Sequence, residues 1–70
     1  MLNVNAVNLK GKSFNISVFD NTGKLAYKEN GTVENSEITK VVNCSSFSSG
    51  LFIVKLSTEQ EQKVKKFVKN

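Results

Sequence analysis

Apolar and polar residues alternate along much of this chain, and a period of two is typical of β-strands that bury one face. The clearest case is residues 14–19, where apolar side chains at every second position alternate with Asn15 and Ser17. Similar runs recur between clusters of Gly, Asn, Asp and Ser. They predict further strands at residues 2–6, 24–28, 37–42, 51–56 and 63–69.

The breaks between these runs predict tight turns. Residues 20–23, Asp-Asn-Thr-Gly, combine side chains that bond their own backbone with a glycine that accepts a positive φ, so the flanking strands form a hairpin. The Asn-Gly pair at residues 30–31 predicts a further turn, of type I′ if the flanking strands pair closely. The serine-rich residues 44–50 form a loop that places Phe47 in the core, and the polar residues 59–62 reverse the chain.

The last two strands are expected at different places in a sheet. Residues 51–56 are the longest apolar run, which predicts a central strand covered on both faces. Residues 63–69 place Phe67 on one face and Val64 and Val68 on the other, with lysines between them. Lysine discourages unwanted strand pairing, so this segment is expected at an exposed edge, through which copies of the chain could also associate.

These elements together predict an all-β fold: an immunoglobulin-like β-sandwich of six or seven short antiparallel strands. Turn signals recur about every 8 to 12 residues, and no helical period competes with them. No linker or repeat divides the chain, so residues 1–70 are expected to form a single domain. A chain of this length buries only about 60% of its unfolded surface, so we expect marginal stability.

The chain has a positive net charge, and all of its basic side chains are lysines. The chain has 10 lysines and 6 acidic residues, a net charge of +4 and a pI near 9.4. Such a charge is typical of nucleic-acid-binding proteins, but arginine is the residue suited to bidentate contacts with phosphate and bases. We therefore interpret the lysines as a solvated surface and expect no nucleic-acid partner.

The side chains that most enzymes and metal sites need are missing or isolated. There is no histidine, the commonest catalytic base and metal ligand, and Cys44 is the single cysteine. The carboxylates lie in turns and loops, and the glycines are too dispersed for a phosphate-binding loop. We expect no enzymatic activity, no cofactor and no metal, and interpret Cys44 as a small core or turn residue.

Neither a membrane span nor an N-terminal export signal is predicted. No apolar run approaches the roughly 18 residues of a span, and residues 1–10 lack a basic stub followed by an apolar stretch. If the domain acts outside the cytoplasm, it is therefore expected to be the tail of a longer precursor that carries its own signal.

Three sequence blocks follow one another in a distinctive order. Residues 16–25 read I-S-V-F-D-N-T-G-K-L, residues 46–55 read S-F-S-S-G-L-F-I-V-K, and residues 65–69 read K-K-F-V-K next to the chain end. This order resembles the C-terminal sorting domains of the type IX secretion system, of type A, whose blocks are similar to I-S-V-Y-D-x-T-G-K-L, S-x-L-x-x-G-x-Y-x-V-K and a K-K-apolar-apolar-K ending. The resemblance covers nearly the whole chain.

The family motif falls on named positions of this sequence. Asp20, Thr22, Gly23 and Lys24 match its turn, Gly50, Phe52 and Val54 its second block, and Lys65, Lys66, Val68 and Lys69 its basic ending. Phe52 stands where the family commonly has Tyr, Phe47 stands where Leu is commoner, and the Asn-Pro element that usually precedes the first strand is absent. We expect Gly50 to adopt a positive φ or to approach a neighbouring strand closely.

The resemblance implies a role in protein export by Bacteroidetes. It implies that the domain follows a cargo protein into the periplasm and is recognised there by the outer-membrane translocon. A cell-surface sortase would then remove it and join the cargo to an anionic lipopolysaccharide, so the final location is the outer membrane, the cell surface or the medium. An open sheet edge and lysines suit recognition by strand addition and electrostatic steering.

Two other functions are compatible with the residues. A structural or adhesive immunoglobulin-like module would need the same turns but not the basic ending. A small barrel that binds single-stranded nucleic acid would use Phe14, Phe19, Phe52 and Phe67 as stacking platforms. Because four of the five phenylalanines lie in apolar runs, core packing is the favoured interpretation.

Overall fold

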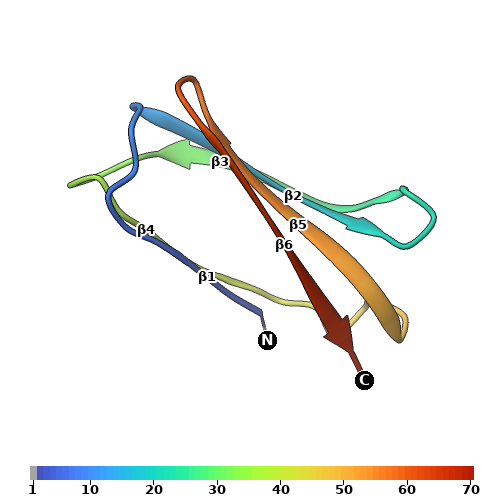
Figure 1. Cartoon of the computed structure of the whole chain (residues 1–70). Helices are drawn as coiled ribbons and strands as arrows, with labels where there is room; N and C mark the ends of the chain where they lie inside the picture. The colour runs from blue at the N-terminus through green and yellow to red at the C-terminus, as the bar shows by residue number, and fades with distance from the viewer. Residues whose placement is uncertain (1) are drawn as a thin grey trace.

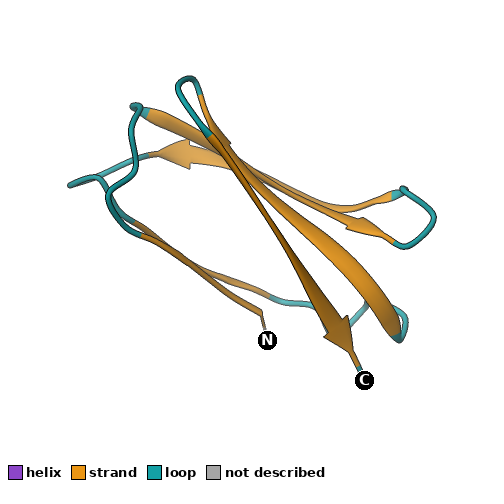
Figure 2. Cartoon of the chain, in the orientation of Figure 1, coloured by secondary structure: helices purple, strands orange, loops and turns teal. Residues whose placement is uncertain are grey.

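The computed structural model describes residues 2–70, which form strands and turns but no helix (Figures 1 and 2). The six strands of this range are β1 (Leu2–Ala6), β2 (Ser13–Asp20), β3 (Leu25–Thr32), β4 (Ile38–Val42), β5 (Gly50–Thr58) and β6 (Gln62–Lys69). They confirm the predicted strands, although β2, β3 and β5 extend further than the alternation indicated.

The strands form two antiparallel sheets. One sheet has the order β1-β4 and the other the order β3-β2-β5-β6. Figure 1 shows the two-stranded sheet facing one side of the four-stranded sheet. The prediction of an all-β sandwich with six antiparallel strands is therefore confirmed.

The core lies between the two sheets. Its fully buried side chains are Ile16 and Val18 on β2 and Val42 on β4, each with 0% of its surface exposed. Phe47 and Phe67 are partly buried against this cluster, which confirms the predicted position of Phe47. Cys44, two residues after the end of β4, is buried with a free thiol, which agrees with its interpretation as a small core residue.

Strand β5 is central in its sheet but is covered on only one face. Phe52 and Val54 point into the core, whereas Leu51 on the opposite face is 40% exposed. The prediction that both faces of residues 51–56 are covered is therefore wrong. The second sheet lies on one side of the large sheet, so the odd-numbered side chains of the apolar run face outward.

The Asn-Gly pair at residues 30–31 does not form a turn, which corrects that prediction. Both residues lie within β3, where Gly31 pairs with Phe14 of β2. A Cβ atom on Gly31 would lie 2.5 Å from the Phe14 ring, so the glycine makes room for the ring. The reversal after β3 occurs instead at Asn35 and Ser36, which both have positive φ, of 54° and 58°.

Candidate recognition surface

The three sequence blocks meet at one end of the four-stranded sheet. Because the strands are antiparallel, β2 and β6 end where β3 and β5 begin, and Figure 1 shows the β2–β3 turn and the C-terminus at this end. Asp20 pairs with Phe52, Phe52 with Phe67, and Gly50 with Lys69. Segments that are far apart in the chain therefore form one continuous surface, which we call the motif end.

Asp20 organises the turn between β2 and β3. Its Oδ1 atom accepts hydrogen bonds from the backbone N–H of Thr22 (2.9 Å), the Thr22 hydroxyl (2.6 Å) and the backbone N–H of Lys24 (2.9 Å). The backbone N–H of Gly23 donates to the Asp20 carbonyl at 3.0 Å. The predicted hairpin is confirmed, and most of its polar contacts lie within the turn itself.

The same contacts lower the pKa of Asp20. The hydrogen bond from the Thr22 hydroxyl is the largest cause, followed by the bond from the Lys24 backbone, because both favour the charged carboxylate. The turn therefore holds an ionised carboxylate that is already satisfied by its neighbours. The exposed Lys24 side chain is free to contact a partner.

Gly50 and the aromatic rings shape the rest of the motif end. Gly50 has φ of +136°, and a Cβ atom there would meet no atom within 4 Å, so the backbone dihedral rather than crowding accounts for the glycine. The Phe52 ring lies 5.0 Å from that of Phe47 and 5.3 Å from that of Phe67, between ring centroids. This stack joins the loop before β5 to β6 through dispersion and burial.

The basic ending is divided between the two faces of β6. Lys65 pairs with Val54, which points into the core, whereas Lys66 pairs with Ile53, which points outward. Val68 also lies on the outer face and is 67% exposed. The sequence places these side chains side by side, but the pleat of the strand separates them. Val54, Lys65 and Lys66 also lie further along the sheet than the motif end.

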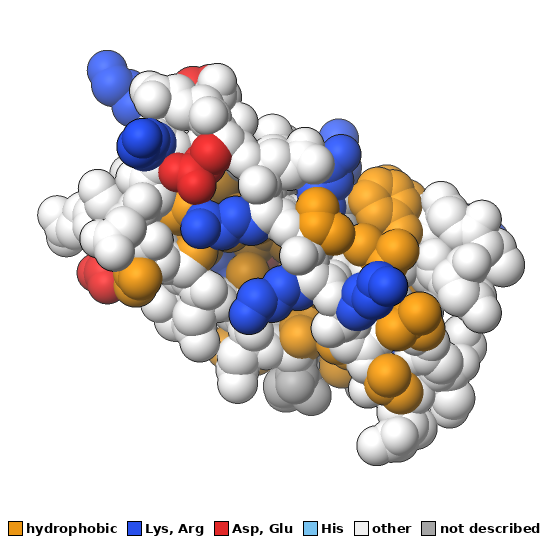
Figure 3. All heavy atoms as spheres, in the orientation of Figure 1, with side chains coloured by type: hydrophobic (Ala, Val, Ile, Leu, Met, Phe, Trp, Pro, Cys, Tyr) orange, Lys and Arg blue, Asp and Glu red, His pale blue; other side chains and the backbone are white. Residues whose placement is uncertain are grey.

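A groove of about 300 Å³ runs between β1 and β6. Its lining includes Leu2, Val4 and Ala6 of β1, Val54 and Leu56 of β5, and Lys63, Lys65 and Phe67 of β6. Figure 3 shows lysine side chains around this hollow and hydrophobic atoms at its floor. The sequence does not predict the groove. The spacing of two between Lys63, Lys65 and Phe67 does, however, indicate that these side chains lie on one face of the strand.

The opposite side of the sandwich is closed by polar contacts. Lys40 of β4 lies 3.3 Å from the carboxylate of Glu29 on β3, and the Tyr27 hydroxyl donates to the same carboxylate at 2.5 Å. The pKa of Glu29 is lowered, first by the Tyr27 hydroxyl and then by Lys40. The two edges of the sandwich therefore differ: one is bridged and the other is open.

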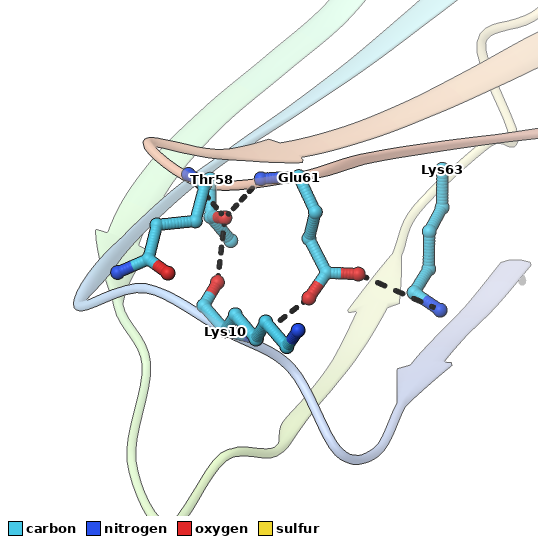
Figure 4. A network of polar contacts seen from close by, with 5 residues as sticks. Lys10, Thr58, Glu61 and Lys63 are labelled. Carbon is cyan, nitrogen blue, oxygen red and sulfur yellow. Dashed lines mark hydrogen bonds and ion pairs between the residues drawn. The ribbon is translucent and has the colours of Figure 1, made fainter.

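The turn between β5 and β6 is fastened to the loop between β1 and β2 (Figure 4). Glu61 accepts a hydrogen bond from the backbone N–H of Lys10 at 2.6 Å and lies 3.8 Å from the ammonium of Lys63. The Thr58 hydroxyl donates to the Lys10 carbonyl at 2.6 Å. These contacts fix the start of β6 relative to β1, so they set the width of the groove at this end.

Glu59 makes a similar attachment beside Glu61. Its carboxylate accepts hydrogen bonds from the backbone N–H groups of Lys12 and Ser13. The bond from Lys12 is the largest cause of its lowered pKa. The sequence predicts only that Glu59 and Glu61 lie in a polar loop. In the structure their carboxylates accept hydrogen bonds from the backbone of the loop between β1 and β2.

Among the described residues, some features that other functions would need do not occur. Within residues 2–70, no three His, Cys, Asp or Glu side chains lie close enough to hold a metal ion. No helix long and apolar enough to cross a membrane occurs in this range. Phe14 and Phe52 are each only 2% exposed, so these rings are not available for stacking on bases.

The fold defines a small β-sandwich domain. Comparison with protein families shows which one: residues 1–70 match the secretion system C-terminal sorting domain, and the chain belongs to this family. No curated protein and no solved structure matches the chain. The match confirms the resemblance to type IX sorting domains.

Family membership identifies the chain as a C-terminal secretion signal. Such a signal directs export across the outer membrane to the cell surface or the medium. Domains of this family are recognised by the secretion machinery, and the family is not an enzyme family.

Proposed function

We propose that this domain is the C-terminal part of a longer precursor and that the translocon reads it through the motif end. In this proposal the cargo precedes residues 1–70, passes through the periplasm and leaves by the outer-membrane translocon. A cell-surface sortase then removes the domain and attaches the cargo to the surface. The observation that supports this most is the convergence of three distant sequence blocks at one end of one sheet.

The residues of the motif end divide into two roles. Asp20, Thr22, Gly23, Gly50 and Phe52 build the shape of the surface through the turn, the backbone dihedral and the ring stack. Lys24, Val68 and Lys69 are the side chains that we assign to direct contact with the translocon. Lys65 and Lys66 lie beyond the motif end and add positive charge on opposite faces of β6, and the buried Val54 lies beside Lys65 alone.

A reporter fusion tests this function. A reporter with its own periplasmic signal, followed by residues 1–70, should cross the outer membrane of a bacterium that has a type IX system. Deletion of residues 65–70 should leave the reporter in the periplasm. A full-length fusion that folds but stays in the periplasm would contradict the proposal and favour a structural or adhesive role.

Truncation alone could act by unfolding the domain, so a variant that changes only charge is needed. Replacing Lys65, Lys66 and Lys69 by Gln retains much of each side chain, and surface changes usually alter stability by no more than about 0.5 kcal/mol. Export that is lost while the fold is retained would show that the translocon reads these charges. Normal export would restrict recognition to the turn and the apolar surface.

A further inference from the structure

The groove between β1 and β6 has the geometry of a missing strand position. Within residues 2–70, β1 pairs only with β4 and β6 pairs only with β5, so each has an unpaired edge at the groove. An immunoglobulin sandwich of the constant type packs four strands against three, whereas here two strands face four. One more strand on the free edge of β1 would lie over the inner face of β6.

The chemistry of the groove indicates what such a strand carries. The inner face of β6 presents Lys63, Lys65 and Phe67 in succession, and Val54 and Leu56 form an apolar floor beside them. Lys65 forms no ion pair within residues 2–70, and Lys63 is held only by Glu61 at 3.8 Å. Covering these ammonium groups without counter-charges would be costly, so the strand needs carboxylates opposite them.

We infer that the groove binds an extended segment of a partner protein that adds to the free edge of β1 and carries two acidic side chains and one apolar side chain at alternate positions. The acidic side chains face Lys63 and Lys65, and the apolar one faces Phe67. This inference rests on the proposed function, because it makes the partner a component of the export machinery. Backbone pairing supplies affinity, and the inward side chains supply selectivity.

A second copy of the chain is a poor occupant of the groove. β1 has no charged residue (Leu2–Ala6, LNVNA), and the inner face of β6 is basic. Pairing through these edges would place lysines near lysines or leave them without counter-charges. Lys40 and Glu29 bridge the two sheets on the other side of the sandwich, whereas β1 has no charged residue to pair with the lysines of the groove.

Binding of a designed peptide tests the inference directly. The probe is an acetylated and amidated peptide, Thr-Glu-Thr-Glu-Thr-Val-Thr, together with its reversed sequence, and the control peptides have Gln in place of Glu. Titration into the isotope-labelled 70-residue chain should shift the backbone amide resonances of β1 and β6. The Gln peptides should bind about tenfold more weakly, because they lose both charge pairs; a tenfold change corresponds to about 1.4 kcal/mol.

Matched variants separate the groove from general charge attraction. The double variant Lys63→Gln/Lys65→Gln should bind the acidic peptide about tenfold more weakly than the parent chain. The double variant Lys28→Gln/Lys55→Gln removes the same charge from the outer face of the large sheet and should bind like the parent. Equal weakening in both double variants would overturn the inference.

Joining the acidic segment covalently to the chain tests the groove even if the free peptide binds too weakly to detect. Fusing the acidic segment ahead of Leu2 through a short Gly-Ser linker gives an effective concentration in about the millimolar range. Hydrogen exchange of the β1 amides should then slow relative to the fusion with the Gln segment. Unchanged exchange would overturn the inference.

Other occupants give different results. Concentration-dependent dimers that protect β1 and β6 would show that a second copy fills the groove, and would overturn the inference. A precursor whose own upstream segment fills the groove and excludes the peptide would also overturn it. The peptide experiments do not depend on export, so a chain that fails to bind the peptide can still be a sorting domain. Conversely, a chain that binds the peptide but does not direct export of the reporter would contradict the sorting function and not the groove inference.

Discussion

The Asp20 carboxylate shows why a short polar motif can specify a turn. One oxygen accepts hydrogen bonds from Thr22 and from the backbone of Lys24 and thereby satisfies donors that strand pairing leaves without partners. Thr22 donates one hydrogen bond from its backbone N–H and one from its hydroxyl, so a hydroxyl side chain at this position stabilises the turn. Contacts within the turn thus account for Asp20 and Thr22 without any partner.

The pH dependence of stability tests the state of Asp20. Its pKa is lowered on folding, so it contributes stability above its unfolded pKa, which is lost as the pH falls through the folded value. We expect the thermal midpoint to fall between about pH 5 and pH 2. Asp20→Asn keeps an acceptor oxygen but does not titrate, so its midpoint should fall less.

Circular dichroism melts across this pH range measure the effect, and carboxyl NMR shifts give the pKa of Asp20 itself. Glu29 and Glu59 also have lowered pKa values, so a smaller decrease should persist in the Asn variant. An Asp20 pKa equal to that of an unstructured peptide would contradict this account of the turn.

Gly50 provides a second test at a single residue. Its φ of +136° lies in a region that side chains with a Cβ atom rarely adopt. Gly50→Val should therefore lower the free energy of unfolding by roughly 1 to 3 kcal/mol. Urea denaturation measures the change, with Ser49→Ala as the control in the same loop. A melt of Gly50→Val that coincides with that of the parent would show that the dihedral is not needed.

Among the elements, β3 differs most from the sequence prediction, because the Asn-Gly pair that predicts a turn lies inside the strand. The Phe14 ring of β2 covers the backbone at Gly31, and an aromatic ring over a glycine in a neighbouring strand fills the space that a side chain would otherwise occupy. The local backbone preference of an Asn-Gly pair is the same whether the pair forms a turn or lies inside a strand. Here the Phe14 ring on the neighbouring strand β2 favours the strand.

A double-mutant cycle tests this contact. Gly31→Ala would place a methyl group 2.5 Å from the Phe14 ring, so it should destabilise the fold by about 1 to 3 kcal/mol through overpacking. In a chain that already has Phe14→Leu, the same alanine should cost less, with a coupling energy of about 1 kcal/mol. Additive costs in chemical denaturation would show that the ring and the glycine are independent.

At the scale of the whole molecule, the sandwich is one-sided. The two-stranded sheet covers one face of the large sheet and leaves apolar side chains exposed on the other, among them Leu25, Leu51, Val64 and Val68. In a chain of about 70 residues, one core rarely supplies more than about 3 to 5 kcal/mol of stability. That stability therefore depends on a few side chains of β2, β4 and β5.

Paired valine substitutions test this asymmetry. Val18→Ala and Val42→Ala remove buried methyl groups and should each cost about 2 kcal/mol. Val64→Ala and Val68→Ala, at positions 54% and 67% exposed, should stay within about 0.5 kcal/mol of the parent. Equilibrium denaturation of the four variants gives the comparison. A large loss at Val68 would mean that the outer face is covered in solution.

The sequence by itself determined the class of fold and the approximate position of each strand, although not the end of β3. Alternating apolar positions, Gly and Asx turn residues and the absence of a helical period are local properties, and they specify strands and tight turns. The order of the three blocks also identified the family, since order along a chain is visible without a structure.

Only the tertiary structure decided which faces are covered and which distant residues meet. A run such as Leu51–Leu56 has no local signal that distinguishes one covering sheet from two. The strand period puts Lys65 and Lys66 on opposite faces of β6, but only the register with β5 shows that Lys65 is on the face toward the core. Likewise, nothing near Glu59 and Glu61 in sequence indicates that they accept hydrogen bonds from the loop between β1 and β2. The physical reason is that strand pairing and sheet packing join segments tens of residues apart, whereas alternation reports only the period within one segment.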